Sequence, residues 1–416
     1  MKKVKKKCKI KYFLISILVC LVVLMMTFVH FGGIGTGKSA NAEEFEKYAD
    51  IVENLAIPND KKIIALGEAS HGNKEFQRLK LDVFKILVER YGVRSFLIEG
   101  DYGGCEEVNK FIHGSEETAE QAAVKIGFNI YKTDEIAELL EYMREYNSKA
   151  KEGDDIRFYG FDMQRVFYTA EIVKQECKKM NIDIYDFEKL ILNDKFNNSF
   201  DSDYQKEILN NLKNDLEKIN AENKIIHSVD MLMQYSEIMS TDVTNAAELR
   251  DKFMAENVQW IFEIEKADGR ERIFLTAHNS HIAKWGSYNS MGKILSENSK
   301  NGYYAIGTDF YKTYCNVPIK GSGKRVNRVF YSHNPLAKAA KICGYDICWI
   351  DFNKIPENSE LGLQISDYTY MGNIGEGYSF IMRLLPPSYR MFQPPAQLYD
   401  SMIFVSSATP IKIKFK

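Results

Sequence analysis

A short apolar run follows two lysines and ends at a glycine and an ionisable residue: Lys61-Lys62-Ile63-Ile64-Ala65-Leu66-Gly67-Glu68. Apolar runs of this length, bounded by turn signals, are typical of buried strands. The pattern returns at residues 94–98, 156–161, 272–276 and 303–307. Strands separated by helical stretches predict an α/β fold with a mostly parallel sheet flanked by helices.

The segments between these strands have helical spacing. Residues 76–90 place apolar side chains at Phe76, Leu79, Val83, Phe84 and Leu87, and residues 136–146 are also predicted to be helical. Residues 166–266 are mostly helical and rich in charge. We therefore expect one α/β domain over residues 43–416, with a long helical insertion or lid at roughly 166–266.

The first 42 residues are typical of a segment that directs a chain across a membrane. They hold eight lysines and no acidic residue, an apolar run at residues 13–29, and then Ala40-Asn41-Ala42. A basic stretch, an apolar core and a small-residue site indicate a secretory signal. We expect residues 1–42 to be a signal peptide cleaved after Ala42 or a membrane anchor through residues 13–29, with the body extracytoplasmic.

The same segment contains a P-loop pattern, G-x-x-x-x-G-K-[ST], at residues 32–39. A true P-loop joins a strand to a helix, whereas the apolar run here is too long for a strand and has a signal-type basic flank. We interpret residues 32–39 as a flexible connection between the apolar run and the folded body.

Charge and cysteine content exclude two classes of protein. The chain has 55 basic and 57 acidic residues, and without the eight N-terminal lysines the body has 47 against 57. Such an acidic body does not suit nucleic-acid binding. Five cysteines in a large body do not form a disulfide framework, and free buried thiols are expected, although Cys343 and Cys348 could pair.

Each predicted strand is followed by ionisable side chains. They are Glu68 with His71, then Glu99, Asp162, His278 with His281, and Asp309. In open α/β sheets the ligand crevice lies beyond the carboxyl ends of the strands, so these side chains are predicted to converge on one pocket. A single acid at such a position often caps the next helix, and Glu99 or Asp162 alone would be interpreted that way.

The available residues favour water activation by histidine. The chain has no G-x-S-x-G nucleophile elbow and no H-E-x-x-H metal-binding helix. A neutral histidine is a good general base near neutral pH, and neighbouring carboxylates can orient its ring and stabilise the imidazolium.

The ordered motifs resemble the erythromycin esterase family over roughly residues 45–412. The most specific are Ala65-Leu66-Gly67-Glu68-Ala69-Ser70-His71-Gly72 and Ala277-His278-Asn279-Ser280-His281. Further matches are Phe96-Leu97-Ile98-Glu99-Gly100, Tyr159-Gly160-Phe161-Asp162-Met163-Gln164, Arg250-Asp251 with Met254-Ala255-Glu256-Asn257, and Tyr399-Asp400-Ser401-Met402-Ile403-Phe404 with Thr409-Pro410.

The resemblance implies hydrolysis of an ester or lactone, such as a macrolide lactone, without a serine nucleophile. It implies that His71 is the general base, with Glu68 and Glu99 beside it and His278 as a further catalytic residue. We expect substrate contacts from His281, Arg250, Asp162 and Lys80, which stands where the family usually has arginine. No metal or other cofactor is expected, and the partner is a small-molecule ester or lactone.

Two alternatives remain open. A metal-dependent hydrolase could use His71, His278 or His281 with Glu68 or Glu99, since two histidines and a carboxylate are a common zinc set. An extracytoplasmic protein that binds a ligand in the same cleft, without turnover, is the other.

Overall fold

The computed structural model describes residues 2–27, 37–192, 195–197, 200–286 and 288–415. Within these residues, nine strands form one central sheet in the order β1-β10-β13-β8-β2-β7-β3-β4, with β9 paired to β8. Its parallel strands are β2 (Ile63–Glu68), β3 (Ser95–Asp101), β4 (Arg157–Asp162), β7 (Ile273–His278), β8 (Tyr303–Pro318) and β13 (Ser401–Ala408). The predicted α/β fold with a mostly parallel sheet is confirmed.

The antiparallel part of the sheet is not predicted by the sequence analysis. It consists of β10 (Ile347–Asp351) and β1 (Ala49–Asp50) at one edge, and of β9 (Arg325–Tyr331) against the far half of β8. A separate hairpin pairs β11 (Thr369–Gly372) with β12 (Arg390–Gln393), and β5 (Ile191–Leu192) pairs with β6 (Lys195–Phe196).

Helices cover both faces of the sheet because its strands alternate buried side chains between two cores. Ile64 and Leu66 of β2 lie in one core, whereas Ile63 and Ala65 lie in the other. The helices of the first half are α2 (Ala42–Tyr48), α3 (Lys74–Tyr91), α4 (Tyr102–Ile112), α5 (Ala119–Lys125) and α6 (Asp134–Asn147). Those of the second half are α12 (Asn279–Ile282), α13 (Met291–Asn298), α14 (Pro335–Ile342), α15 (Glu360–Ser366), α16 (Ile381–Leu384) and α17 (Pro395–Leu398).

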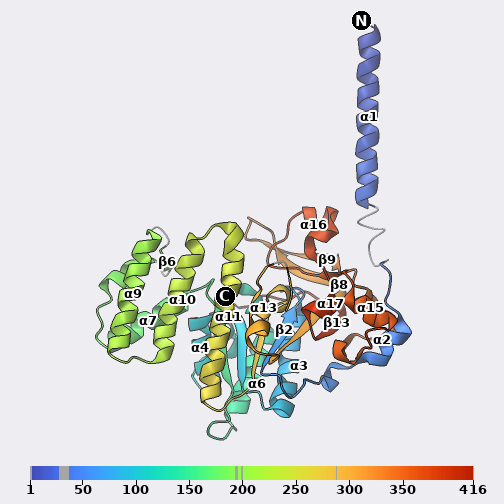
Figure 1. Ribbon diagram of the computed structural model, residues 1–416. Coiled ribbons are helices and arrows are strands. Elements are labelled where there is room, and N and C mark those ends of the chain that lie inside the picture. The colour runs from blue at the N-terminus through green and yellow to red at the C-terminus, as the bar shows by residue number, and fades with distance from the viewer. Residues whose placement is uncertain (1, 28–36, 193–194, 198–199, 287, 416) are drawn as a thin grey trace.

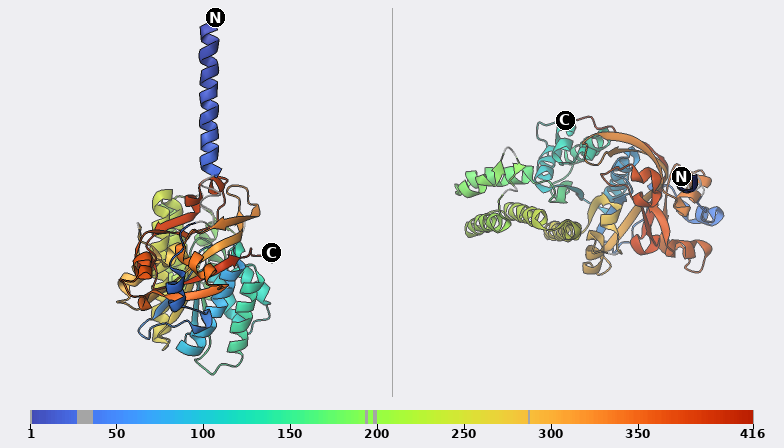
Figure 2. Two further views of the ribbon diagram at one scale, coloured as in Figure 1. Left: turned by 90° about the vertical axis from the view of Figure 1, so that its right-hand side faces the viewer. Right: turned by 90° about the horizontal axis from the view of Figure 1, so that it is seen from above.

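A helical extension projects from one side of the sheet (Figures 1 and 2). It contains α7 (Phe167–Lys179), α8 (Tyr185–Lys189), α9 (Ser202–Lys218), α10 (Asn223–Ser240) and α11 (Val243–Ala267). The predicted helical stretch is therefore present, and its description as an insertion or lid stays a prediction. The last helix of the extension, α11, leads the chain back to the sheet and packs against β4.

The N-terminal helix α1 (Lys2–Thr27) extends away from the body in Figures 1 and 2, and its apolar side chains from Tyr12 to Leu24 are exposed. Among the described residues, none of the helices combines the length and the hydropathy needed to cross a membrane. Residues 28–36, which include the end of the predicted apolar run and most of the P-loop pattern, lie outside the described residues.

The chain after this gap is built into the body. Ala40 is buried and its N–H donates to the Pro335 carbonyl at 3.0 Å. Asn41 caps α2 by accepting from the Glu44 N–H at 3.1 Å, and its amide donates to Glu360 at 2.8 Å. Residues 40 and 41 thus stabilise α2 and its contact with α15.

Among the described residues, the expected free thiols are confirmed for the five body cysteines, which are Cys105, Cys177, Cys315, Cys343 and Cys348.

Candidate active site

The predicted polar residues meet at the carboxyl ends of four adjacent strands. The neighbours β2, β7, β3 and β4 end at Glu68, His278, Asp101 and Asp162, with Glu99 inside β3. A cavity of about 590 Å³ opens above them and is lined by His71, Glu99, Arg250, His278 and His281. This is the place where parallel α/β sheets bind ligands.

His71 lies in the cavity wall beside a buried carboxylate. Its Nδ1 is 3.8 Å from Oε1 of Glu68, which is longer than a hydrogen bond. Glu68 is held from behind by Lys80, whose Nζ lies 2.8 Å from the same oxygen, and by Gln77, whose amide donates to Oε2 at 3.2 Å. Lys80 in turn donates to Gln77 Oε1 at 3.0 Å, so α3 fixes the carboxylate behind the histidine.

These contacts set the protonation of the pair. Burial alone would lower the pKa of His71, but the Glu68 carboxylate outweighs burial and raises it above its ordinary value. Burial would raise the pKa of Glu68, whereas Lys80 and His71 hold it below its ordinary value. Glu68 therefore stays ionised, and its charge favours the proton on Nδ1 and leaves the Nε2 lone pair of neutral His71 free to accept.

A second buried carboxylate, Glu99, is held by Arg250. The Arg250 guanidinium donates to Glu99 Oε1 at 2.7 Å and forms a two-pronged pair with Asp162 at 3.0 and 2.8 Å. Burial would raise the pKa of Glu99, but His281 and Arg250 outweigh burial and hold it well below its ordinary value. Arg250 thus locks the ends of β3 and β4 to α11.

His278 is a neutral histidine that faces His71, with ring centroids 4.8 Å apart. Burial next to two other histidines lowers the pKa of His278 to about 3. Its backbone N–H donates to Glu99 Oε2 at 3.0 Å, and its Nδ1 accepts the Ser280 N–H at 3.5 Å. The same Nδ1 also lies 2.9 Å from the Ser280 hydroxyl, which can donate or accept. Nε2 of His278 is buried and has no hydrogen-bond partner among the described residues.

His281 is oriented from both sides. Its Nδ1 lies 2.9 and 3.0 Å from the two oxygens of Asp251, and Arg250 donates to its Nε2 at 3.1 Å. A guanidinium can only donate, so in neutral His281 Nε2 accepts and Nδ1–H donates to Asp251. Burial would lower the pKa of His281, but the Asp251 and Glu99 carboxylates raise it above its ordinary value and favour the charged ring.

Three predicted residues take positions other than those expected. Lys80 is fully buried behind Glu68, and Asp162 is buried behind Arg250, so neither can touch a ligand in the cavity directly. Asp309 is not part of the cavity lining, because β8 continues past it to Pro318. It accepts from Ser332 and Asn334, both at 2.8 Å, and ties β8 to the start of α14.

Other residues of the site come from segments without a periodic pattern. Tyr131 lines the cavity and donates to the Glu99 carbonyl at 3.1 Å. Arg165 and Glu376 also line it, and Arg325 of β9 holds Glu376 through two contacts at 2.6 and 2.8 Å. Gln77, which holds Glu68, was not predicted either. The only feature of the sequence that could have indicated it is its position one turn before Lys80 on the same helix.

The charges around the histidines do not fit a divalent metal ion well. Both carboxylates nearest to them are already paired with buried cations, Glu68 with Lys80 and Glu99 with Arg250. In the part of the chain that the structure describes, no three His, Cys, Asp or Glu side chains are grouped so that they could hold a metal.

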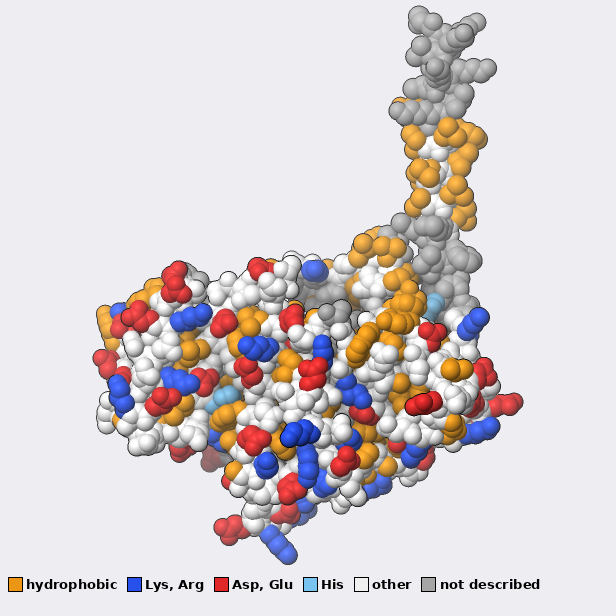
Figure 3. Space-filling view, viewed as in Figure 1, with side chains coloured by type: hydrophobic (Ala, Val, Ile, Leu, Met, Phe, Trp, Pro, Cys, Tyr) orange, Lys and Arg blue, Asp and Glu red, His pale blue; other side chains and the backbone are white. Residues whose placement is uncertain are grey.

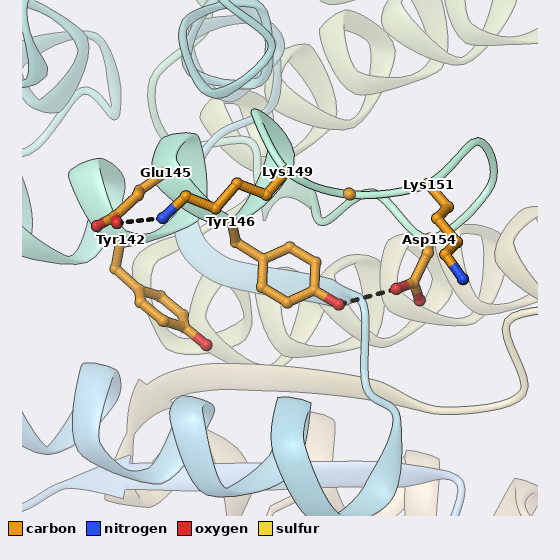
Figure 4. Close-up of a pocket in the computed structure, with 7 residues that line it drawn as sticks. Tyr142, Glu145, Tyr146, Lys149, Lys151 and Asp154 are labelled. Atoms are coloured by element: carbon orange, nitrogen blue, oxygen red, sulfur yellow. Dashed lines mark hydrogen bonds and ion pairs between the residues drawn. The ribbon is translucent and has the colours of Figure 1, made fainter.

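A second hollow lies at the end of α6 and in the loop that follows it (Figure 4). Its polar groups pair with one another: Lys149 with Glu145 at 2.6 Å, and the Tyr146 hydroxyl with Asp154 at 3.0 Å. No histidine is among the described residues that line it, so it lacks the base that the first cavity has.

Comparisons with known proteins show the family of this chain. The family model for erythromycin esterase matches residues 88–408, beginning after the strand that carries Glu68. Erythromycin esterase type II of Escherichia coli is 26% identical over 372 residues, which cover 75% of this chain and 86% of that protein.

Two solved structures show the same fold. A Bacillus cereus protein superposes with a TM-score of 0.74 at 19% identity, covering 90% of this chain and 98% of its own. A mutant of the erythromycin esterase EreC in its open conformation has a TM-score of 0.58 at 14% identity, covering 85% of this chain and 92% of its own. Since the family model spans most of the body, this chain belongs to the erythromycin esterase family.

Proposed function

We propose that the protein hydrolyses an ester or a lactone with a water molecule activated by His71, without a serine nucleophile. The observation that carries the proposal is the pairing of His71 with an ionised, buried Glu68 in the wall of the cavity. Membership of the family supports ester hydrolysis as the class of reaction. The cavity wall contains His71 as a base and Glu68 as the carboxylate that orients it.

In this mechanism His71 Nε2 takes a proton from water as the oxygen attacks the ester carbonyl. Glu68 stabilises the imidazolium that forms, and a contact of 3.8 Å can tighten when substrate is bound. The neutral His278 can donate Nε2–H to the negative oxygen of the tetrahedral intermediate, as a neutral histidine is suited to do. The imidazolium then returns its proton to the leaving alkoxide.

The remaining charged residues are proposed to position these groups. Arg250 and Asp162 fix Glu99, and Glu99 fixes the backbone of His278 through its N–H. His281 stays a proposed substrate contact, because it lines the cavity.

The proposal is tested with the purified full chain against simple esters and macrolactones, with and without a chelator. We expect turnover that the chelator leaves unchanged. Turnover that a chelator removes and zinc restores would favour the metal-dependent alternative instead. Saturable ligand binding without turnover of any compound would favour the binding-protein alternative.

A pH profile tests the role of Glu68. The base must be neutral, so activity is lost as the pH falls through the raised pKa of His71, and the acidic limb should lie above the ordinary value of about 6.5. Glu68→Gln removes the largest charge that raises this pKa, so the limb should move to lower pH. Glu376→Gln should move it less in the same direction, because Glu376 acts more weakly on His71. An unmoved limb in both variants would assign the titration to another group.

We also propose that the body is extracytoplasmic and stays attached to the membrane through residues 13–29. Cleavage after Ala42 would remove the buried Ala40 and the Asn41 cap of α2, which the body uses. These contacts support retention of the segment over its removal.

A further inference from the structure

An apolar face is exposed on the side of the body that carries α16. Phe380 is 64% exposed, Ile381 51% and Leu385 46%. Tyr370 and Phe392, which pair across the β11–β12 hairpin with ring centroids 4.8 Å apart, are exposed as well. These five residues are called the α16 face below. Single exposed apolar residues need no explanation, but contiguous ones mark an interaction surface.

Arg390 joins the two halves of this face. Its guanidinium lies over the Tyr370 ring at 5.9 Å and over the Tyr389 ring at 5.0 Å. Tyr389 belongs to the 3₁₀ turn Pro386–Tyr389, which packs directly against α16. The hairpin therefore adjoins the turn that follows α16, and hydrophobic side chains gather on the side of the body nearest α1 in Figure 3.

The N-terminal segment enters the body beside the same face. The Gly37 carbonyl accepts from Lys338 Nζ at 2.5 Å, and Gly37 lies against His333. Two residues earlier, the Tyr331 carbonyl accepts from Arg390 at 2.8 and 3.0 Å. Figure 1 places α16 on the side of the body from which α1 extends.

The length of the connection limits how far the body can be from the end of α1. Residues 28–36 can span about 30 Å when fully extended, at ~3.3–3.6 Å per residue. A body tied at Gly37 to such an anchor keeps Gly37 within about 30 Å of the end of α1.

We propose that the α16 face docks on the outer surface of the bilayer that holds residues 13–29. This inference rests on the proposed retention of the N-terminal segment. Exposed apolar side chains next to basic ones are the pattern of surfaces that lie in a membrane interface. Arg383 lies over the Phe380 ring at 5.8 Å. Lys320, in the β8–β9 turn, is exposed, and its N–H donates to the Tyr378 carbonyl at 2.9 Å, so its side chain can meet lipid phosphates.

The same segment connects this face with the proposed active site. Asn373, Gly375 and Glu376 line the cavity, and Phe380 follows four residues after Glu376. Docking would therefore hold one rim of the cavity at the lipid surface. Amphipathic esters that partition into the bilayer are the substrates that this arrangement favours.

The test uses the full chain reconstituted in vesicles with and without brominated lipid, which quenches nearby tryptophan. Phe380→Trp adds a reporter on the α16 face, and Val243→Trp adds a matched reporter at a 92% exposed apolar position in the helical extension. The emission added over wild type should be quenched by at least half for Phe380→Trp and should be unchanged for Val243→Trp. Both positions are exposed, so neither change should disturb the fold.

Three results would overturn the proposal. Equal quenching of the two reporters would show that the α16 face is not at the bilayer. Crosslinking of two chains through position 380 without quenching would assign the face to a second copy. A mature chain that lacks residues 1–42 and is found in the soluble fraction would remove the anchor, and the docking with it. None of these results bears on ester turnover, which is measured on the same preparation.

Discussion

Replacing His71 with alanine should lower kcat/KM for a cleaved ester by about 10²–10⁴-fold, the usual contribution of a general base. His71 lines the cavity, its Nδ1 faces the ionised Glu68, and its ring lies 4.8 Å from that of His278. Loss of the imidazole removes the proton acceptor but leaves the cavity and the other charges in place. The fall should therefore appear mainly in kcat, measured under steady-state conditions across the pH range.

His113→Ala is the matched control, because His113 is exposed at the C-terminal cap of α4 and does not line the cavity. Its ring nitrogens lie 2.7 Å from the Asn109 carbonyl and 3.2 Å from Asp155. Its activity should equal that of the wild type. If His71→Ala retained full activity while remaining folded, the base would be another group, and neutral His278 would be the next to test.

Replacing Lys80 with methionine should lower the free energy of unfolding by about 3–5 kcal/mol, the usual cost of leaving one charge of a buried pair alone. Lys80 is fully buried, and its Nζ lies 2.8 Å from Glu68, which is also buried. Methionine fills a similar volume, so the loss reports the charge of Glu68 and not a cavity. Urea denaturation with an unchanged slope would measure it.

The loss should depend on pH in a defined direction. In the wild type the pKa of Glu68 is lowered, so its ionised form adds stability above its unfolded-state pKa, and this is lost as pH falls through the folded value. Without Lys80, burial raises the pKa of Glu68, and the variant should be least destabilised in acid.

Two further variants separate charge from packing. The double variant Lys80→Met with Glu68→Gln should regain most of the stability, since no unpaired charge remains. Lys74→Met, in the exposed first turn of the same helix, should cost about 0–1 kcal/mol. If Lys80→Met also lowered the free energy of unfolding by only about 0–1 kcal/mol, the charge of Glu68 would be neutralised by protonation or by a group other than Lys80.

The sequence predicted the strands that carry the site because each is a short apolar run that ends in an ionisable residue. Glu68 and His278 occupy paired positions on neighbouring strands, as a parallel sheet requires. The prediction for Asp309 was wrong, because β8 runs on from Tyr303 to Pro318 as a strand exposed in part beyond Phe310. The hydrophobic run covers the half of β8 that pairs with β2, and it stops before the half that pairs with β9 from Lys312 onward.

The sequence also did not show in which direction each site side chain points. Lys80 stands on the inner face of α3, one turn from the buried Gln77 and Phe84. Its position in the motif predicted a contact with the substrate. The packing of α3 against the sheet instead places its Nζ beside Glu68, on the side away from the cavity. Tyr131, Arg165 and Glu376 come from turns and loops, whose positions no periodicity encodes.

The central position of β2 also shapes how the chain must fold. Its two neighbours, β7 and β8, begin only at Ile273 and Tyr303, and β13 completes the parallel half from Ser401. Pairings between segments so distant in sequence form slowly, because long loops must close before contacts repay the lost entropy. During synthesis β2 therefore emerges long before any strand can cover it. We expect folding to wait for the synthesis of β13, and the nascent chain to need a holding factor until then.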